Sequence, residues 1–338
     1  MKATLLFSNL VSLLAIGAIH AQSDSTWLKL EKEIVLPGVE GRIDHLSVDI
    51  PGKRLFVAAL GNGTIEVLDL TKNERTAQIS RLEEPQGLYF DATRNRLYVA
   101  SGGDGTLRIY NGTNLVLDDK IELGDDADNV RGDVHADRIF VGYGSGALAI
   151  TTLTGQNLGR IVLGSHPESF QLEQSGLRVF VNVPKETAVA VVDRTKKMVV
   201  AKWNIDATSA NYPMALDEAD QRLFVGCRTP PEVVVLDTDS GHLVAKLPVV
   251  GDTDDLFFDP ARRLLYVIGG QGAVDIVQMR DPNHYEPVER IPTASGARTG
   301  LLVPDFDRLF VAAPHRGSRP ARILVYQIAH RQPATTEH

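Results

Sequence analysis

The sequence of 338 residues is poor in cysteine, in tryptophan and in clustered basic residues. Cys227 is the only cysteine, so a disulfide within the chain is excluded and stability has to come from packing. Cys227 ends the apolar stretch LFVGC, and we interpret it as a small buried core residue. The formal net charge is −8 and no lysine or arginine cluster is present, so we do not expect nucleic acid as a partner.

Several catalytic signatures are also missing. The sequence has no CxxCH motif for covalent haem and no Walker loop for nucleotide phosphates. The glycine-rich stretch GYGSG at 142–146 lacks the G-x-S-x-G spacing of a serine nucleophile, and we interpret its glycines as turn residues. Haem chemistry and serine catalysis are therefore not expected.

Long hydrophobic runs are confined to the N-terminus. Lys2, an uncharged apolar run over residues 5–18 and small residues before Gln22 form a secretory signal pattern, with cleavage expected after Ala21. The run is short for spanning a bilayer and no second one follows. We therefore predict a signal peptide at 1–21, a periplasmic or secreted protein and no membrane insertion.

A repeat of 40–44 residues covers the rest of the chain. Each copy contains an arginine-led, aromatic-centred apolar stretch such as RLFVAA or RLYVAS. The central aromatic residues are Phe56, Tyr98, Phe140, Phe180, Phe224, Tyr266 and Phe310. This period is typical of a four-stranded propeller blade, and seven copies predict an all-β, seven-bladed β-propeller over residues 22–329.

The seventh copy contains too few strands to complete a blade. Its last strand pattern is ARILVYQI, and the tail at 330–338 has no strand pattern, so we expect the tail to be flexible. The segment 28–37, LKLEKEIVLP, precedes the first copy and has no other partner. We predict that it forms the outer strand of blade seven and closes the ring, since an open sheet edge is unfavourable.

The repeats also resemble a known family. The stretches FVAAL, LYVAS and LFVGC, each followed by a glycine-containing turn and an apolar strand that ends in Asp, look like the YVTN-type repeats of YncE-like exported β-propellers. The resemblance covers essentially the whole mature chain and implies the propeller fold. It implies no catalytic residues, because this group has no shared catalytic signature.

Two charged positions recur in nearly every copy, which indicates a structural role. An acidic residue stands seven positions before the central aromatic in six copies, and an arginine stands two positions before it in six. We interpret them as turn caps or as ion pairs across the first hairpin of each blade. The acidic residues are Asp49, Asp91, Asp133, Glu173, Asp217 and Asp259.

A third position is polar in every copy but chemically different. It lies twelve residues before the central aromatic, where the innermost strand begins at the mouth of the central channel. Together with neighbouring polar residues, these positions predict a ligand-binding mouth. The predicted residues are Arg42, Asp44, His45, Gln86, Asp128, Asn129, His166, Glu168, Tyr212, Asp254 and Arg298.

The polar mouth admits several interpretations. Arg298 is expected between Asp254 and Asp44, where a salt-bridge network would only seal the ring. Alternatively, Asp128, His166 and Glu168 are candidate ligands of a divalent cation, the one cofactor considered. Carboxylates and histidines crowded in this way also fit acid/base catalysis. Four basic residues of the hairpins are expected to lie over the acidic residues that surround the channel mouth, which we call the acidic ring. They are Arg228, His315, Arg316 and Arg319.

From these observations we expect a monomeric binding or scaffold protein. Its predicted partner is a small polar molecule or a loop of another protein, bound at the channel mouth. The alternative function is a metal-assisted lactonase or related hydrolase at the same mouth. With only Trp27 and Trp203 present, the tryptophan-rich blades of quinone-dependent dehydrogenases are missing, so a redox enzyme is not expected.

Overall fold

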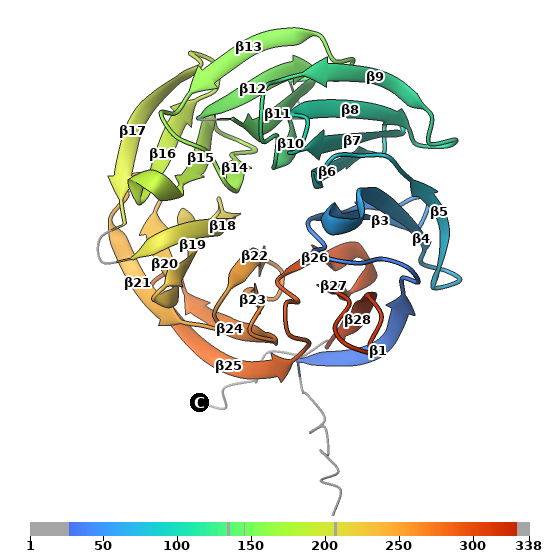
Figure 1. Cartoon of the computed structure of the whole chain (residues 1–338). Helices are drawn as coiled ribbons and strands as arrows, with labels where there is room; N and C mark the ends of the chain where they lie inside the picture. The colour runs from blue at the N-terminus through green and yellow to red at the C-terminus, as the bar shows by residue number, and fades with distance from the viewer. Residues whose placement is uncertain (1–26, 134–135, 145, 206–207, 330–338) are drawn as a thin grey trace, which may run out of the picture.

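The protein is a seven-bladed β-propeller in a computed structural model that describes residues 27–133, 136–144, 146–205 and 208–329. Seven antiparallel sheets of four strands surround a central opening (Figure 1). The predicted fold class is therefore confirmed. The predicted signal peptide at 1–21 and tail at 330–338 lie outside the described residues. Among the described residues, no helix has the length and apolar composition needed to cross a membrane.

Each blade runs from an innermost strand at the axis to an outer strand at the rim (Figure 1). Blade one consists of β2 (Leu46–Asp49), β3 (Arg54–Ala59), β4 (Thr64–Asp69) and β5 (Glu74–Ile79), and blade two of β6 (Pro85–Asp91), β7 (Arg96–Ser101), β8 (Thr106–Asn111) and β9 (Leu117–Glu122). Blade three consists of β10 (Val130–Asp133), β11 (Arg138–Tyr143), β12 (Ala147–Thr152) and β13 (Asn157–Val162). Blade four consists of β14 (Phe170–Leu172), β15 (Arg178–Val183), β16 (Ala188–Asp193) and β17 (Met198–Asn204).

The remaining three blades follow the same order, except that the last one takes its outer strand from the N-terminal end. They consist of β18 (Ser209–Asp217), β19 (Arg222–Thr229), β20 (Pro231–Asp237), β21 (Leu243–Pro248); β22 (Thr253–Asp259), β23 (Leu264–Gly269), β24 (Ala273–Asp281), β25 (His284–Pro292); β26 (Thr299–Val303), β27 (Arg308–Ala313), β28 (Arg322–Ile328), β1 (Leu28–Val35). Short 3-10 turns occur at η1 (Leu60–Asn62), η2 (Pro184–Glu186) and η3 (Pro304–Phe306).

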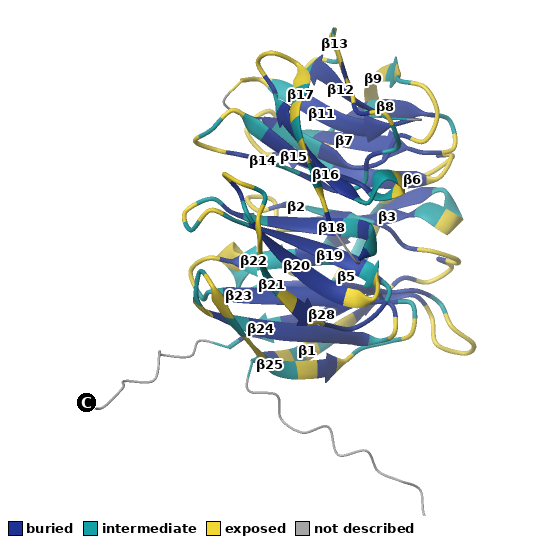
Figure 2. Cartoon of the chain, turned by 90° about the vertical axis from the view of Figure 1, so that its left-hand side faces the viewer, coloured by how far each residue is buried: buried dark blue, intermediate teal, exposed yellow. Residues whose placement is uncertain are grey.

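The hydrophobic core is divided into clusters between neighbouring blades. The seven central aromatics lie on the second strands and are almost completely buried. Phe56 of blade one stacks on Phe90 of blade two with ring centroids 5.2 Å apart, and Phe224 packs against Phe258 of blade six at the same distance. Figure 2 shows the buried strands between exposed loops. The second and third strands are apolar on both faces because each inner sheet is covered on both sides.

The ring closes between the two ends of the chain. β1 pairs antiparallel with β28, from Leu28 opposite Ile328 to Val35 opposite Arg322 (Figure 1, blue beside red). The predicted closing strand is therefore confirmed, although it ends at Val35 rather than at residue 37. Pro37 and Gly38 form a turn there, and the positive φ of Gly38 (75°) is a conformation that glycine adopts without strain.

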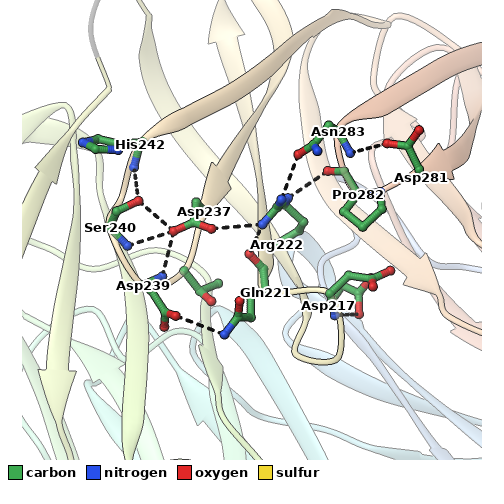
Figure 3. Close-up of polar contacts among 12 residues, drawn as sticks. Asp217, Gln221, Arg222, Asp237, Asp239, Ser240, His242, Asp281, Pro282 and Asn283 are labelled. Carbon is green, nitrogen blue, oxygen red and sulfur yellow. Dashed lines mark hydrogen bonds and ion pairs between the residues drawn. The ribbon is translucent and has the colours of Figure 1, made fainter.

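The recurring acidic residues cap the first turn of the blades, as predicted. Asp49 accepts a hydrogen bond from the Gly52 amide (2.9 Å) and pairs with Arg54 at 2.7 Å. The predicted pairing with the repeated arginine recurs in blade four, between Glu173 and Arg178, but the acids of blades two, three and six pair with Arg94, Arg194 and Arg262 instead. Blade five also departs from the predicted pairing (Figure 3). Asp217 caps the turn, but Arg222 pairs with Asp237 at 3.0 Å.

Arg222 also joins blade five to blade six (Figure 3). Its guanidinium donates to the Pro282 carbonyl and to the Asn283 side chain, each at 2.8 Å. Arg54 and Arg178 make equivalent bonds to the Gly112 and Thr238 carbonyls, so three of the repeated arginines tie neighbouring blades together.

The closing strand makes a testable contribution to stability. Ile34 is 1% exposed and packs against core residues of blades one and seven, whereas the adjacent Val35 is 45% exposed. Truncating a buried isoleucine costs about 2–5 kcal/mol, and surface changes stay within about 0.5 kcal/mol. We expect Ile34→Ala to lower the free energy of unfolding in urea by this larger amount and Val35→Ala to change it little. Equal effects of the two substitutions would contradict ring closure by β1.

Candidate functional site

Equivalent backbone hydrogen bonds place three acidic side chains at the same point of three blades. Each residue precedes the innermost strand and donates its backbone amide to a carbonyl two residues after the central aromatic, at 2.7–3.0 Å. The pairs are Asp44 with Ala58, Asp128 with Gly142, and Glu168 with Asn182. The inner strands surround a common axis (Figure 1), and the three carboxyl groups are close enough for the charges of Asp128 and Asp44 to act on Glu168.

His45 lies among carboxylates from three blades. Its Nδ1 is 3.4 Å from Asp255 Oδ1, and its Nε2 is 3.9 Å from Asp44 Oδ1 and 4.0 Å from Asp128 Oδ1. Burial alone would lower the pKa of His45, but the charges of Asp255 and Asp44 outweigh it and raise the pKa to about 10. His45 is therefore a cation at neutral pH and links blade one to blades three and six.

The bridging arginine at this mouth is Arg42. Its guanidinium is 2.9 Å from Asp44 and 3.9 Å from Asp254. The expected bridge by Arg298 is wrong, because Arg298 pairs with Asp252 at 2.9 Å. The Arg298 carbonyl accepts a hydrogen bond from the Asp255 amide, so the start of blade seven is aligned with blade six and the side chain reaches the loop before β22.

Arg228 is the basic hairpin residue that contacts the acidic ring. It pairs with Asp254, donates to the Thr253 carbonyl at 2.9 Å, and lies over the ring of Tyr212 at 4.0 Å from its centroid. In contrast, His315 of the longer seventh hairpin pairs with Glu40 at 2.8 Å. Arg316 and Arg319 exchange backbone hydrogen bonds within that hairpin. The expected cover of the ring by basic residues is thus seen for Arg228 only among these four.

Asp128, His166 and Glu168 form a compact group of potential metal ligands. Each offers one ligand atom, and these atoms lie within 4.8 Å of one another. His166 Nδ1 lies 2.8 Å from the Gly144 carbonyl, which can only accept, so Nδ1 is the donor in this contact. Asp126 lies 3.5 Å from the same Nδ1. The structure thus brings the three predicted ligands together.

The mouth contains buried acceptors without hydrogen bonds. Four buried oxygens accept no hydrogen bond from any described residue. They are Asp44 Oδ1, Asp128 Oδ1, Asn129 Oδ1 and Asp254 Oδ2. Asp44 is 1% exposed and Asp128 is 7% exposed. A buried acceptor left without a partner costs roughly 1–3 kcal/mol, so their grouping in one place indicates a site for a ligand.

Burial also shifts the acidity of these carboxyl groups. Burial, followed by the charges of Asp128 and Asp254, raises the pKa of Glu168 to about 9. Burial raises the pKa of Asp128 to about 6 although His45 opposes the shift, and raises that of Asp254 to about 6 although Arg228 opposes it. These carboxyl groups are therefore not all ionised at the same time, as expected where like charges crowd a buried site.

Gln86 and Asn129 are held by hydrogen bonds at the entrances of blades two and three. The Gln86 amide donates to Asp126 at 3.3 Å and so joins blade two to blade three beside His166. The buried Asn129 is held by a hydrogen bond from the Gly142 amide to its backbone carbonyl at 3.0 Å. Tyr212 lies beside blade four, because its carbonyl accepts the amide of Ser169 at 3.3 Å, whereas Arg298 pairs with Asp252 before blade six.

Two functional candidates, Asp255 and Arg131, were not predicted. Asp255 contacts His45, and its other oxygen accepts the Gly300 amide at 2.8 Å. Arg131 lies over the ring of Phe170 at 5.6 Å from its centroid and lines a cavity of about 200 Å³ together with Asp255, Ser169 and Gln171. The sequence did contain a signal for Arg131. Of the seven residues that stand nine positions before a central aromatic, Arg131 is the only charged one.

Comparisons with known proteins support the fold. No family model matches the chain, and no curated protein matches it, so the resemblance to YVTN-type repeats stays a prediction. A chain of hydrazine synthase from Kuenenia stuttgartiensis superposes with a TM-score of 0.72 at 16% identity, covering 82% of this chain and 95% of that one. A chain of the mitotic checkpoint complex superposes with a TM-score of 0.76 at 14% identity, covering 98% and 100%. At these identities the likeness establishes the fold alone.

The raised pKa of Glu168 predicts a pH dependence of stability. Between pH 4.5, its ordinary pKa, and about 9, the folded protein holds a proton that the unfolded chain has lost. The free energy of unfolding should therefore fall as the pH rises through this window. Glu168→Gln cannot ionise, so its stability should fall less steeply, as measured by urea unfolding at pH 6, 7.5 and 9 with EDTA present. The exposed Glu74→Gln serves as control, and a Glu168→Gln curve parallel to wild type would contradict the assignment.

Proposed function

We propose that this propeller is a binding module that takes a small polar molecule at the channel mouth. The observation that carries the proposal is the group of buried carboxylate oxygens of Asp44, Asp128 and Asp254 that accept no hydrogen bond among the described residues. A ligand that donates hydrogen bonds would satisfy them, and each bond to a charged acceptor is worth about 1.5–3 kcal/mol. The ligand is therefore a molecule with ammonium or hydroxyl groups.

The size of the channel supports a small ligand. The cavity beside Asp255 measures about 200 Å³, which is less than the roughly 300 Å³ at which pockets for drug-sized molecules begin. Arg131 and Asp255 line this cavity and offer a donor and an acceptor to the inner end of the ligand. A loop from a partner protein is the alternative occupant, since propeller folds commonly bind protein partners.

A second candidate function follows from the cluster of Asp128, His166 and Glu168. If these residues hold a divalent ion, the site becomes that of a metal-assisted lactonase or related hydrolase, because such an ion polarises a carbonyl oxygen or activates water. We also propose that the protein is exported and acts as a monomer. The support for export is the signal pattern of residues 1–21.

The binding proposal is tested by thermal shift of the protein in EDTA with glucosamine, spermidine and glucose, which carry donors, and with acetate, which offers acceptors only. At a hundredfold excess over Kd a ligand stabilises the folded protein by about 2.7 kcal/mol, which raises Tm measurably. We expect at least one donor-bearing compound to raise Tm and acetate to have no effect.

Variants locate the binding. Asp44→Asn and Asp254→Asn should abolish the shift, because each replaces a carboxylate by a neutral amide at the mouth. Asp118→Asn, on the exposed outer strand β9, should retain the shift. If none of the donor-bearing compounds raises Tm, or if the shift persists in Asp44→Asn, the mouth is not the binding site.

A further inference from the structure

We propose that Asp128, His166 and Glu168 bind one divalent first-row transition-metal ion at the channel mouth. Their ligand atoms lie within 4.8 Å of one another, and in the part of the chain that the structure describes they are the one such group of three. Asp128 is buried, with only 7% of its surface exposed, and its Oδ1 accepts no hydrogen bond from a described residue. His45 Nε2 lies 4.0 Å from this oxygen, beyond hydrogen-bond distance, so a metal ion would supply its close partner.

The geometry needs only a small contraction. In a tetrahedral site with bonds of about 2.1 Å, the ligand atoms are about 3.4 Å apart. Three atoms separated by at most 4.8 Å reach that arrangement when each moves by less than about 1 Å. Glu168 is partly exposed, so rotation of its side chain can supply most of this movement.

The surroundings of His166 are those of a metal-binding imidazole. A ligating histidine usually donates its other ring N–H to a carbonyl or carboxylate, which fixes the ring and its tautomer. His166 Nδ1 donates to the Gly144 carbonyl at 2.8 Å, with Asp126 at 3.5 Å. Gly144 is itself anchored, because its amide donates to the Asp125 carbonyl at 2.8 Å. With Nδ1 donating to Gly144, Nε2 is the ring nitrogen that the neutral imidazole would offer to an ion.

The ligand types select the class of ion. One imidazole and two carboxylates suit zinc or manganese, whereas calcium and magnesium favour sites made of oxygen atoms alone. Three protein ligands leave at least one coordination position for water or for an oxygen of a bound molecule. The inference does not depend on the proposed ligand, since the ion alone is sufficient to test it.

The first test is calorimetric titration of the EDTA-stripped and dialysed full chain with zinc chloride, without any organic compound. We expect one zinc ion per chain and at least tenfold weaker binding of calcium. His166→Gln, Asp128→Asn and Glu168→Gln should each lower zinc affinity at least about tenfold, since even residues behind the ligands contribute this much. His284→Gln removes an exposed histidine that pairs with Asp281 at 2.8 Å, so it controls for adventitious surface binding.

The outcomes separate the possibilities. Unchanged zinc affinity in folded His166→Gln, loss of affinity in His284→Gln, or equal affinity for calcium would overturn the proposal. If the variants do not fold, as judged by circular dichroism, X-ray absorption of the zinc-loaded wild type decides. Scattering from one imidazole nitrogen at about 2.0–2.1 Å is expected, and its absence would overturn the site. Because the thermal-shift test contains EDTA, failure of one proposal leaves the other standing.

Discussion

The whole structure depends on the burial of both faces of every blade. Each hydrophobic cluster draws its residues from two neighbouring sheets, as Phe56 and Phe90 do between blades one and two. A sheet with one neighbour missing would expose an apolar face, so the blades are stable only as a closed ring. Closure in turn sets the width of the central channel and brings charged residues from separate blades to within about 4 Å of one another.

Internal repetition made the fold predictable, because the same apolar and turn residues recur at a fixed interval. The spacing of the central aromatics identified the blades, and the unpaired segment at 28–37 identified the closing strand. The site was predictable only in part. Sequence position within a repeat locates Asp44, Asp128 and Glu168 at equivalent entrances, but it does not reveal which side chain reaches across the axis. For that reason the sequence did not predict that Arg42, rather than Arg298, bridges Asp44 and Asp254. The contact of His45 with Asp255 was missed for the same reason.

The channel mouth and the blades follow opposite physical rules. Between blades, apolar side chains are packed on both sides and the recurring turn acids have hydrogen-bond partners. At the mouth, carboxylates lie buried close to one another, some of their oxygens accept no hydrogen bond among the described residues, and the pKa of Glu168 rises to about 9. Such an arrangement lowers the stability of the folded protein, and local conflict of this kind is expected where a protein binds a ligand or performs chemistry.

The pairing of Leu28 with Ile328 has a consequence for how the protein is made. β1 is the first strand to be synthesised and its partner β28 is the last. The sheet that contains both can therefore be completed only about 300 residues after β1 has been made. Until then β1 is an unpaired edge strand, and it is exposed to association with other chains. A nascent chain therefore benefits from a chaperone, and C-terminal truncation products should be aggregation-prone even when most of their blades are intact.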